Sequence, residues 1–262
     1  MAHSLSPVLH NAAYAALGLH GWYYDRHDCG EDELAGFVAG LGPEWVGLSL
    51  TMPLKRVALE VADEVTPLAA AVGAANTLLF DSRRRVRVDN TDVAGIVQAL
   101  REAGVDHVGH AVVLGAGGTA QAALAALREL GVRAPDVLVR DPARAEELRA
   151  TADRLGVSPR VVGGFPDVPL PEADLVVSTL PAGAADPWAD RDWPTRTALL
   201  DVVYSPWPTR LAATAAAAGA RVVSGLAMLL HQAVAQVELM TGRPGPVEAM
   251  RAALASAEVG AR

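Results

Sequence analysis

One glycine-rich segment constrains the fold of this 262-residue chain more than any other. Gly115-Ala116-Gly117-Gly118-Thr119-Ala120 follows an apolar run that ends at Leu114 and opens a helical pattern that runs to Leu130. A strand, a glycine turn and a helix in this order form the dinucleotide fingerprint: the first glycine permits a tight turn, and the second lets backbone N–H groups approach a pyrophosphate. The helix N-terminus then faces the phosphate charge. The segment predicts a dinucleotide-binding α/β domain, and a purely structural turn is the alternative.

A regular alternation of strands and helices after residue 92 agrees with that interpretation. We expect strands at 110–114, 136–140, 160–162, 175–178, 199–202 and 221–224, and helices at 93–103, 120–130, 143–155 and 211–218. This alternation predicts a mostly parallel, doubly wound sheet with helices on both faces. The tail predicts two more helices, at 226–240 and 246–257, which fold back on the first domain.

The first 92 residues differ, because short helices and short apolar strands are mixed there. We expect helices at 8–17 and 68–72 and a third that begins near Lys55. Strands are expected at 45–50, 77–80 and 85–88, the last two joined by a polar turn. The chain therefore divides into an α/β domain of residues 1–92, a Rossmann-type domain of residues 93–225 and C-terminal helices at 226–262.

Composition excludes several classes of protein. The formal net charge is −8, which does not favour nucleic acid or anionic membranes as partners. The single cysteine, Cys29, forms no internal disulfide, and no cysteine or histidine cluster has the spacing of a metal site. No signal peptide is visible, and glycines interrupt the uncharged stretch 108–127, so we expect a cytoplasmic protein.

The end of the second strand in the Rossmann-type domain indicates which dinucleotide is bound. Arg140 and Arg144 lie where an NADP-binding protein places arginine against the 2′-phosphate, whereas an NAD-binding protein places an acidic residue there. Asp141 complicates this assignment, and ordinary surface arginines are the alternative. We favour NADP.

Polar clusters in the first domain are unusual for plain structure. They are Ser4 and Ser6 before Pro7, Ser49 and Thr51 before Lys55, and Asn76-Thr77 with Asn90-Thr91-Asp92. Each cluster alone has a structural alternative: Ser6 as a helix N-cap, Thr91 and Asp92 as another cap, and Lys55 as a solvated lysine.

In this order the clusters resemble the shikimate dehydrogenase family. Its Ser-x-Ser-Pro, Thr-x-Pro-x-Lys, Ala-Asn-Thr and Asn-Thr-Asp motifs match residues 4–7, 51–55, 75–77 and 90–92. The glycine turn, the two arginines, Asp201-Val202-Val203-Tyr204 and the segment from Ser224 to Gln232 match as well, so the likeness spans nearly the whole chain.

The resemblance implies an enzyme that reduces the ring ketone of 3-dehydroshikimate with NADPH in aromatic amino acid biosynthesis. Lys55 and Asp92 would be the catalytic pair, with the lysine donating a proton to the oxygen that receives negative charge. The implied substrate-binding residues are Ser4, Ser6, Thr51, Asn76, Tyr204 and Gln232. The implied cofactor-binding residues are Gly115, Ala116, Gly117, Gly118, Thr119, Ala120, Arg140, Arg144, Ser178, Thr179, Val202, Gly225 and Met228. No metal is implied.

The sequence departs from the family pattern at several places. Ser49 stands where the family often has Asn, Ala227 where it often has Gly, and Asp141 where a hydroxyl is common. The family also has a strand and a Gly-x-Pro-Ile turn before the Ser-x-Ser loop, whereas this sequence begins at Met1-Ala2-His3. The resemblance therefore predicts that a first strand in the middle of the substrate-domain sheet is absent.

Other functions remain open at this point. A quinate/shikimate or aminoshikimate dehydrogenase would keep the fold and change the substrate, and Ser6 favours shikimate. A non-catalytic NADP-binding sensor would not need Lys55 and Asp92. The sequence does not set the oligomeric state, and a homodimer is one of the states left open.

Overall fold

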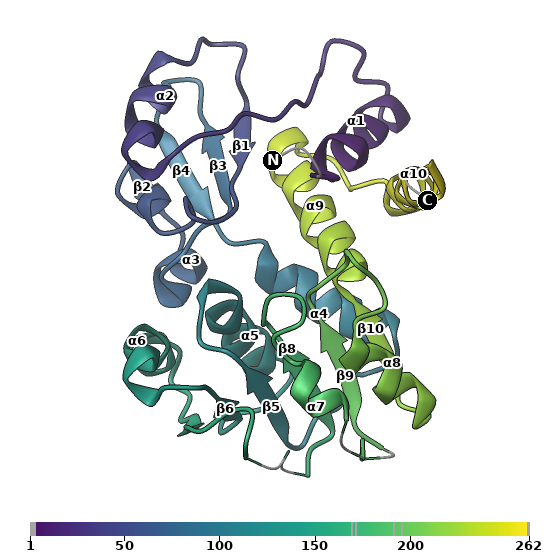
Figure 1. Cartoon of the computed structure of the whole chain (residues 1–262). Helices are drawn as coiled ribbons and strands as arrows, with labels where there is room; N and C mark the ends of the chain where they lie inside the picture. The colour runs from purple at the N-terminus through teal and green to yellow at the C-terminus, as the bar shows by residue number, and fades with distance from the viewer. Residues whose placement is uncertain (1–3, 169, 171, 191, 195, 261–262) are drawn as a thin grey trace. The chain divides into compact units, whose positions relative to one another are not determined.

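The computed structural model describes residues 4–168, 170, 172–190, 192–194 and 196–260 (Figure 1). The chain divides into two compact units, one of residues 1–95 with 229–262 and one of residues 96–228. Helices α4 (Asp92–Glu102) and α9 (Gly225–Thr241) each contribute residues to both units. The strand predicted to be absent would precede Ser4, so that prediction lies outside the described residues.

The second unit is built on a six-stranded sheet in which every pairing is parallel. Its strands are β5 (Ala111–Leu114), β6 (Asp136–Leu138), β7 (Arg160–Val162), β8 (Leu175–Ser178), β9 (Ala198–Asp201) and β10 (Val222–Ser224). Their order across the sheet is β10-β9-β8-β5-β6-β7. This is the doubly wound Rossmann order, in which strands are added on one side of β5 up to β7 and then on its other side from β8, so the topological switch point lies between β5 and β8. The predicted α/β fold class is confirmed.

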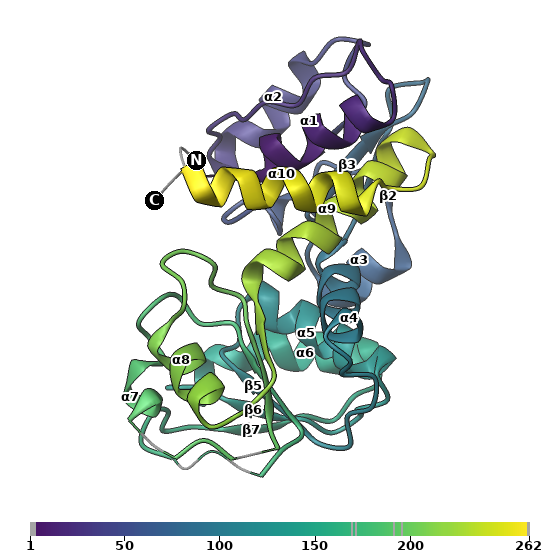
Figure 2. The same cartoon turned by 90° about the vertical axis from the view of Figure 1, so that its right-hand side faces the viewer.

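Helices cover both faces of this sheet (Figure 2). Helices α5 (Gly118–Glu129) and α6 (Glu146–Leu155) lie on one face, and α7 (Asp186–Ala189) and α8 (Arg210–Ala217) lie on the other. Leu114, Val176 and Leu199 of the sheet are buried with Trp188 of α7 and Leu211 of α8 in one apolar cluster. Burial on two sides explains why the strands are continuously apolar rather than alternating.

The first unit contains a smaller mixed sheet in the order β1-β3-β4-β2. Strands β1 (Gly47–Ser49), β3 (Thr77–Phe80) and β4 (Val86–Asp89) pair antiparallel, and β2 (Glu64–Val65) pairs parallel with β4. Helix α2 (Leu34–Gly40) packs Leu34 and Val38 into the core of this sheet. Helix α1 (Ser6–Ala16) packs against α10 (Val247–Gly260), and α3 (Pro67–Val72) leads towards β3.

Several local predictions were wrong. No α-helix begins near Lys55: the Lys55 carbonyl accepts a hydrogen bond from the backbone N–H of Ala75 at 2.7 Å, and only a 3₁₀ turn, η2 (Val57–Leu59), follows. The helix expected at 143–155 is split into a 3₁₀ turn, η3 (Pro142–Ala145), and α6. Ser6 is not an N-cap, because it is the first residue of α1. Four further elements were not predicted from the sequence: η1 (Glu31–Glu33), α2, β2 and α7.

Two features are absent from the part of the chain that the structure describes. No helix there is long and apolar enough to cross a membrane. Among the same residues, no group of three or more histidine, cysteine, aspartate or glutamate side chains is placed to hold a metal ion.

Gly225 is a position where packing requires glycine. A Cβ at Gly225 would lie 2.0 Å from the carbonyl oxygen of Val202, which is backbone and does not move aside. We expect Gly225→Ala to cost about 1–3 kcal/mol, as other overpacked sites do, and to lower the Tm by several degrees. Gly36→Ala in α2 is the matched control, because a Cβ there would meet nothing within 4 Å beyond its chain neighbours and the backbone of its own helix, and it leaves the Tm unchanged or slightly higher. Equal melting temperatures for both variants would contradict this packing argument.

Candidate functional site

Lys55 and Asp92 form an ion pair in the first unit. The Lys55 ammonium donates to Asp92 Oδ2 at 2.6 Å, and the two side chains are 17% and 6% exposed. Lys55 follows the loop after β1, and Asp92 is the first residue of α4. Lys55 is also the only lysine in the sequence, since all other basic side chains apart from histidine are arginines. The predicted catalytic pair is therefore in contact.

The buried side chain of Asn76 holds the other oxygen of the Asp92 carboxylate. Its Nδ2 donates to Asp92 Oδ1 at 2.9 Å and to Gln232 Oε1 at 3.3 Å. Its Oδ1 accepts from the Thr91 backbone N–H at 2.8 Å. Asn76 precedes β3, Gln232 lies on α9, and Asp92 begins α4, so three distant parts of the chain meet here.

The other predicted substrate-binding residues take no part in the hydrogen bonds described above. Ser4 Oγ accepts from the backbone N–H of Ser6 at 3.4 Å, so Ser4 lies beside the start of α1. Thr51 is exposed and lies four residues before Lys55. Tyr204 belongs to the second unit, so its role at a substrate site in the first unit stays a prediction.

His10 is buried beside Ser6, and its lowered pKa leaves it neutral at pH 7. Its Nδ1 donates to the Ser6 carbonyl at 2.9 Å, and its ring stacks on Tyr24 with centroids 4.1 Å apart. Since that carbonyl only accepts, Nδ1 carries the hydrogen, and Nε2 has no hydrogen-bond partner among the described residues. Burial lowers the pKa of His10 to about 4, and the hydrogen bond to Ser6 and the nearby Gln236 side chain offset this only in part.

The glycine turn in the second unit has the geometry of a phosphate cradle. Gly115 has φ +103°, and a Cβ there would lie 2.7 Å from Thr179 Oγ1. Gly117 is the N-cap of α5, and a Cβ on Gly117 or Gly118 would meet nothing within 4 Å. The turn is thus closed on one side, and the space beside the start of a twelve-residue helix is open. Backbone N–H groups in that position bind anions.

Further predicted cofactor-binding residues lie at the carboxyl edge of the same sheet. Ser178 ends β8 and Thr179 follows it, beside the switch point between β5 and β8, and Thr179 Oγ1 donates to the Leu114 carbonyl at 2.7 Å. The Val202 backbone N–H donates to the Ser178 carbonyl at 3.0 Å. Gly225 and Met228 begin α9. Open α/β sheets bind ligands in this region, outside the carboxyl ends of the strands.

Arg140 and Arg144 are exposed after β6, and no hydrogen bond or ion pair of their side chains is found within the described residues. Asp141, in contrast, has a structural role. Its Oδ1 accepts from the Ala143 backbone N–H at 2.9 Å, which caps η3. The Asp141 side chain is thereby directed to its own backbone.

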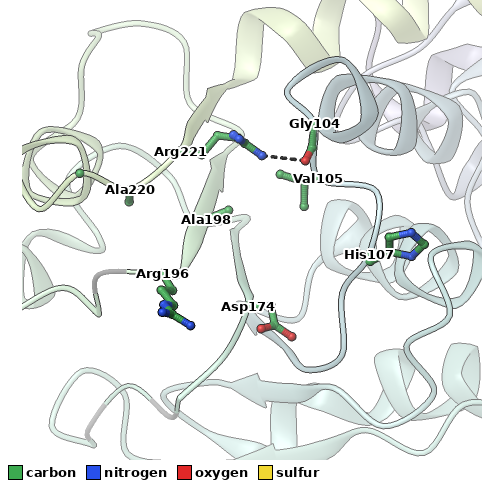
Figure 3. A pocket seen from close by; sticks show the side chains of 9 residues that line it. Gly104, Val105, His107, Asp174, Arg196, Ala198, Ala220 and Arg221 are labelled. Carbon is green, nitrogen blue, oxygen red and sulfur yellow. Dashed lines mark hydrogen bonds between the residues drawn. The ribbon is translucent and has the colours of Figure 1, made fainter.

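A cavity of about 650 Å³ lies elsewhere in the second unit (Figure 3). It is bordered by Asp174, Ala198 and Arg221 at the amino ends of β8, β9 and β10, and Arg221 donates to the Gly104 carbonyl at 2.6 Å. None of the predicted cofactor-binding residues lines it. The cofactor prediction therefore concerns the opposite edge of the sheet.

The fold and these residues define a two-unit α/β protein of the dinucleotide-binding class. Residues 1–78 match the family model described as the shikimate dehydrogenase substrate binding domain, and residues 225–255 match the shikimate 5′-dehydrogenase C-terminal domain. The chain belongs to the shikimate dehydrogenase family, which confirms the resemblance found in the sequence.

Three relatives illustrate the similarity. The shikimate dehydrogenase (NADP(+)) of Symbiobacterium thermophilum is 38% identical, covering 98% of this chain and 92% of the relative. The crystal structure of Mycobacterium tuberculosis shikimate dehydrogenase is 50% identical with a TM-score of 0.87, covering 98% and 96%. The enzyme from Thermus thermophilus, solved with NADP(H) and shikimate, is 36% identical with a TM-score of 0.84, covering 98% and 95%.

Three residues that border the site were not predicted from the sequence. Gln236 bonds to Asn76 and Ser49, and His10 bonds to the Ser6 carbonyl. Burial raises the pKa of Tyr24, and hydrogen bonds to Ser49 and Ser6 oppose this shift. A signal for Gln236 was available, because a second glutamine follows Gln232 by one helical turn in a mostly apolar helix.

The buried neutral His10 predicts a contribution to pH-dependent stability. The unfolded state binds the His10 proton below its ordinary pKa of 6.5, and the folded state does so only near 4, so stability falls as the pH drops between these values. We expect this slope, at most about 1.4 kcal/mol per pH unit, to be smaller in His10→Gln in denaturant melts at pH 4–7. The exposed His20→Gln variant should keep the wild-type slope. A His10→Gln slope equal to that of the wild type would show that the ring does not titrate in this way.

Proposed function

We propose that this protein is an NADP-dependent shikimate dehydrogenase that reversibly reduces 3-dehydroshikimate to shikimate. The observation that carries the proposal is the Lys55–Asp92 pair, whose atoms lie 2.6 Å apart. A chain that uses arginine for every other strong cation retains its single lysine at this contact. An arginine cannot release a proton at neutral pH, whereas a lysine can.

Lys55 and Asp92 have different roles in proton transfer. Reduction of a ring ketone places negative charge on its oxygen, and a lysine ammonium within hydrogen-bond reach stabilises that charge and then donates the proton. The Asp92 carboxylate holds the Lys55 ammonium in one position. Asn76 holds the carboxylate in turn through Oδ1, so the lysine is oriented by two successive contacts.

The remaining polar side chains of the first unit bind and orient the substrate. Ser4 and Ser6 receive the carboxylate, to which Tyr204 also donates, and Thr51, Asn76, Asp92 and Gln232 bind ring hydroxyls. Since both serines are neutral donors, they suit an anion without requiring a buried cation. We assign residues 1–92 as the substrate-binding domain, 93–225 as the NADP-binding domain and 226–262 as helices that return to the first.

The residues of the second unit fit NADP. The open space at Gly117 and Gly118 admits a pyrophosphate to the start of α5, and Arg140 and Arg144 have free guanidinium groups for a 2′-phosphate. When bound, NADPH supplies the hydride. Thr119, Ala120, Ala116, Ser178, Thr179, Val202, Gly225 and Met228 complete the proposed cofactor site.

The first experiment is an absorbance assay at 340 nm with shikimate and NADP⁺ at mildly alkaline pH, in parallel with NAD⁺ and with quinate. NADPH formation from shikimate and NADP⁺ alone supports the proposal. Faster turnover of quinate would assign the quinate/shikimate alternative, with aminoshikimate as a further substrate to compare. Cofactor binding without turnover of any substrate would favour the sensor. The enzyme is proposed to act in the cytoplasm, and its mass in solution separates a monomer from a homodimer.

Lys55→Ala is expected to lower kcat by on the order of 10²–10⁴, the usual effect of removing a positioned proton donor. Lys55→Arg keeps a positive charge near Asp92 and should remain impaired, because arginine does not transfer its proton. The exposed Arg83→Ala variant removes one positive charge elsewhere and serves as the control. Wild-type kcat in Lys55→Arg would exclude Lys55 as the donor.

Arg140→Ala is expected to raise the KM for NADP⁺ by roughly tenfold or more, since a charged hydrogen bond to phosphate is lost. The KM for NAD⁺, which lacks the 2′-phosphate, should change little. Steady-state kinetics with saturating shikimate measure both, and Arg128→Ala at the end of α5 is the control. Equal increases for the two cofactors would contradict a 2′-phosphate contact.

A further inference from the structure

Four side chains of the first unit form a continuous hydrogen-bonded path to Asp92. Ser49 Oγ lies 2.8 Å from Gln236 Oε1, and Gln236 Nε2 lies 3.0 Å from Thr77 Oγ1. Thr77 Oγ1 lies 2.8 Å from Asn76 Oδ1, and Asn76 Nδ2 lies 2.9 Å from Asp92 Oδ1. Gln236, Thr77 and Asn76 are each at most 1% exposed, so water does not compete for these bonds.

The orientation of the Gln236 amide is set by a partner that can only accept. Gln236 Nε2 lies 3.2 Å from the backbone carbonyl of Asn76, so the NH₂ group must face that oxygen. Its Oε1 therefore faces Ser49, and the Ser49 hydroxyl must donate to it. The second hydrogen of Nε2 goes to Thr77 Oγ1, which leaves the Thr77 hydroxyl proton for Asn76 Oδ1.

The orientation of the Asn76 amide is fixed independently at the other end. The Thr91 backbone N–H, which can only donate, lies 2.8 Å from Asn76 Oδ1, and the Asp92 carboxylate, which accepts, lies 2.9 Å from Nδ2. The two amides thus require the same direction for the Thr77 hydroxyl. Every bond along the path from Ser49 donates towards Asp92.

We propose that Gln236, Thr77 and Ser49 are positioning residues that act on the catalytic pair through this one-way hydrogen-bond path. Hydrogen bonds in series polarise one another, and the effect is largest when the last acceptor is an anion and the surroundings exclude water. The path strengthens the Asn76 contact with Asp92 Oδ1. The carboxylate then keeps Oδ2 directed at the Lys55 ammonium. The assignment of Lys55 and Asp92 as the reacting pair rests on the function proposed above.

Neither side-chain packing nor the hydrogen-bonding needs of the backbone explains why Gln236 is present in this path. The Asn76 carbonyl already accepts from the Leu50 backbone N–H at 2.7 Å, so it does not depend on Gln236. An apolar side chain of similar volume at position 236 would pack in the mostly apolar helix α9 at lower cost in buried polar groups. We therefore assign Gln236 a role in orienting Asn76 and Asp92.

Thr77 provides the sharpest test, because Thr77→Val removes the hydroxyl and keeps the shape, whereas Thr77→Ser keeps the hydroxyl. We expect Thr77→Val and Gln236→Met each to lower kcat by roughly tenfold, the effect of losing about one hydrogen bond, with an unchanged KM for NADP⁺. Thr77→Ser should keep most of the activity. The double variant Thr77→Val/Gln236→Met should be no worse than the poorer single variant, because both interrupt one path.

A second measurement does not depend on turnover. In protein labelled with ¹³Cε,¹⁵Nζ-lysine, the side-chain signal comes from Lys55 alone. We expect this signal to shift in Thr77→Val and Gln236→Met and to stay in place in Thr77→Ser, while the Tm measures any general loss of structure. If the wild type does not turn over shikimate, the proposed function fails. The Lys55 signal then still tests whether Thr77 and Gln236 act on Lys55 through the hydrogen-bond path.

Two results would overturn the proposal. The first is an unchanged Lys55 signal, with kcat within twofold of the wild type wherever turnover is measurable, in both Thr77→Val and Gln236→Met. The second is an equal loss in Thr77→Ser and Thr77→Val, which would show that the hydroxyl is not what matters.

Discussion

A buried carboxylate must be compensated, and in this protein the compensation of Asp92 organises the first unit. Its two oxygens are taken by different groups, the Lys55 ammonium and the Asn76 amide, both within 3 Å. A buried ion pair of this kind does not stabilise a fold better than apolar packing would. The arrangement is therefore best explained by chemistry, because it holds an ionisable amine in a defined position beside an anion.

The fold supplies those groups from segments that are remote in sequence. Ser49 and Thr77 are cross-strand partners of β1 and β3, and Asn76 immediately precedes that pair. Helix α9 adds Gln232 and Gln236, one turn apart, more than 150 residues later in the chain. The polar residues consequently form one connected group, and a change in any one of them alters the hydrogen bonds of the others.

The sequence predicted the features that depend on local pattern. Glycines between a strand and a helix predicted the turn at Gly115, and continuous apolar runs predicted β7 and β8 at their observed limits. It did not predict the loop at Lys55, because the Lys55 carbonyl bonds to Ala75 rather than along a helix. It also did not reveal the partners of Gln236, since that residue bonds to Ser49 across 187 positions. Contacts of this length are determined by the packed fold.

The presence of one lysine has a practical consequence. Amine-reactive acylating reagents can modify only the α-amino group and the side chain of Lys55 in this sequence, and a lysine-specific endoprotease has a single cleavage site within it. Once the α-amino group is blocked, covalent labelling of the chain therefore reports on one functional group. Protection of that group by a bound ring carboxylate would report occupancy without any coupled assay, and an attached fluorophore would be located at one known position.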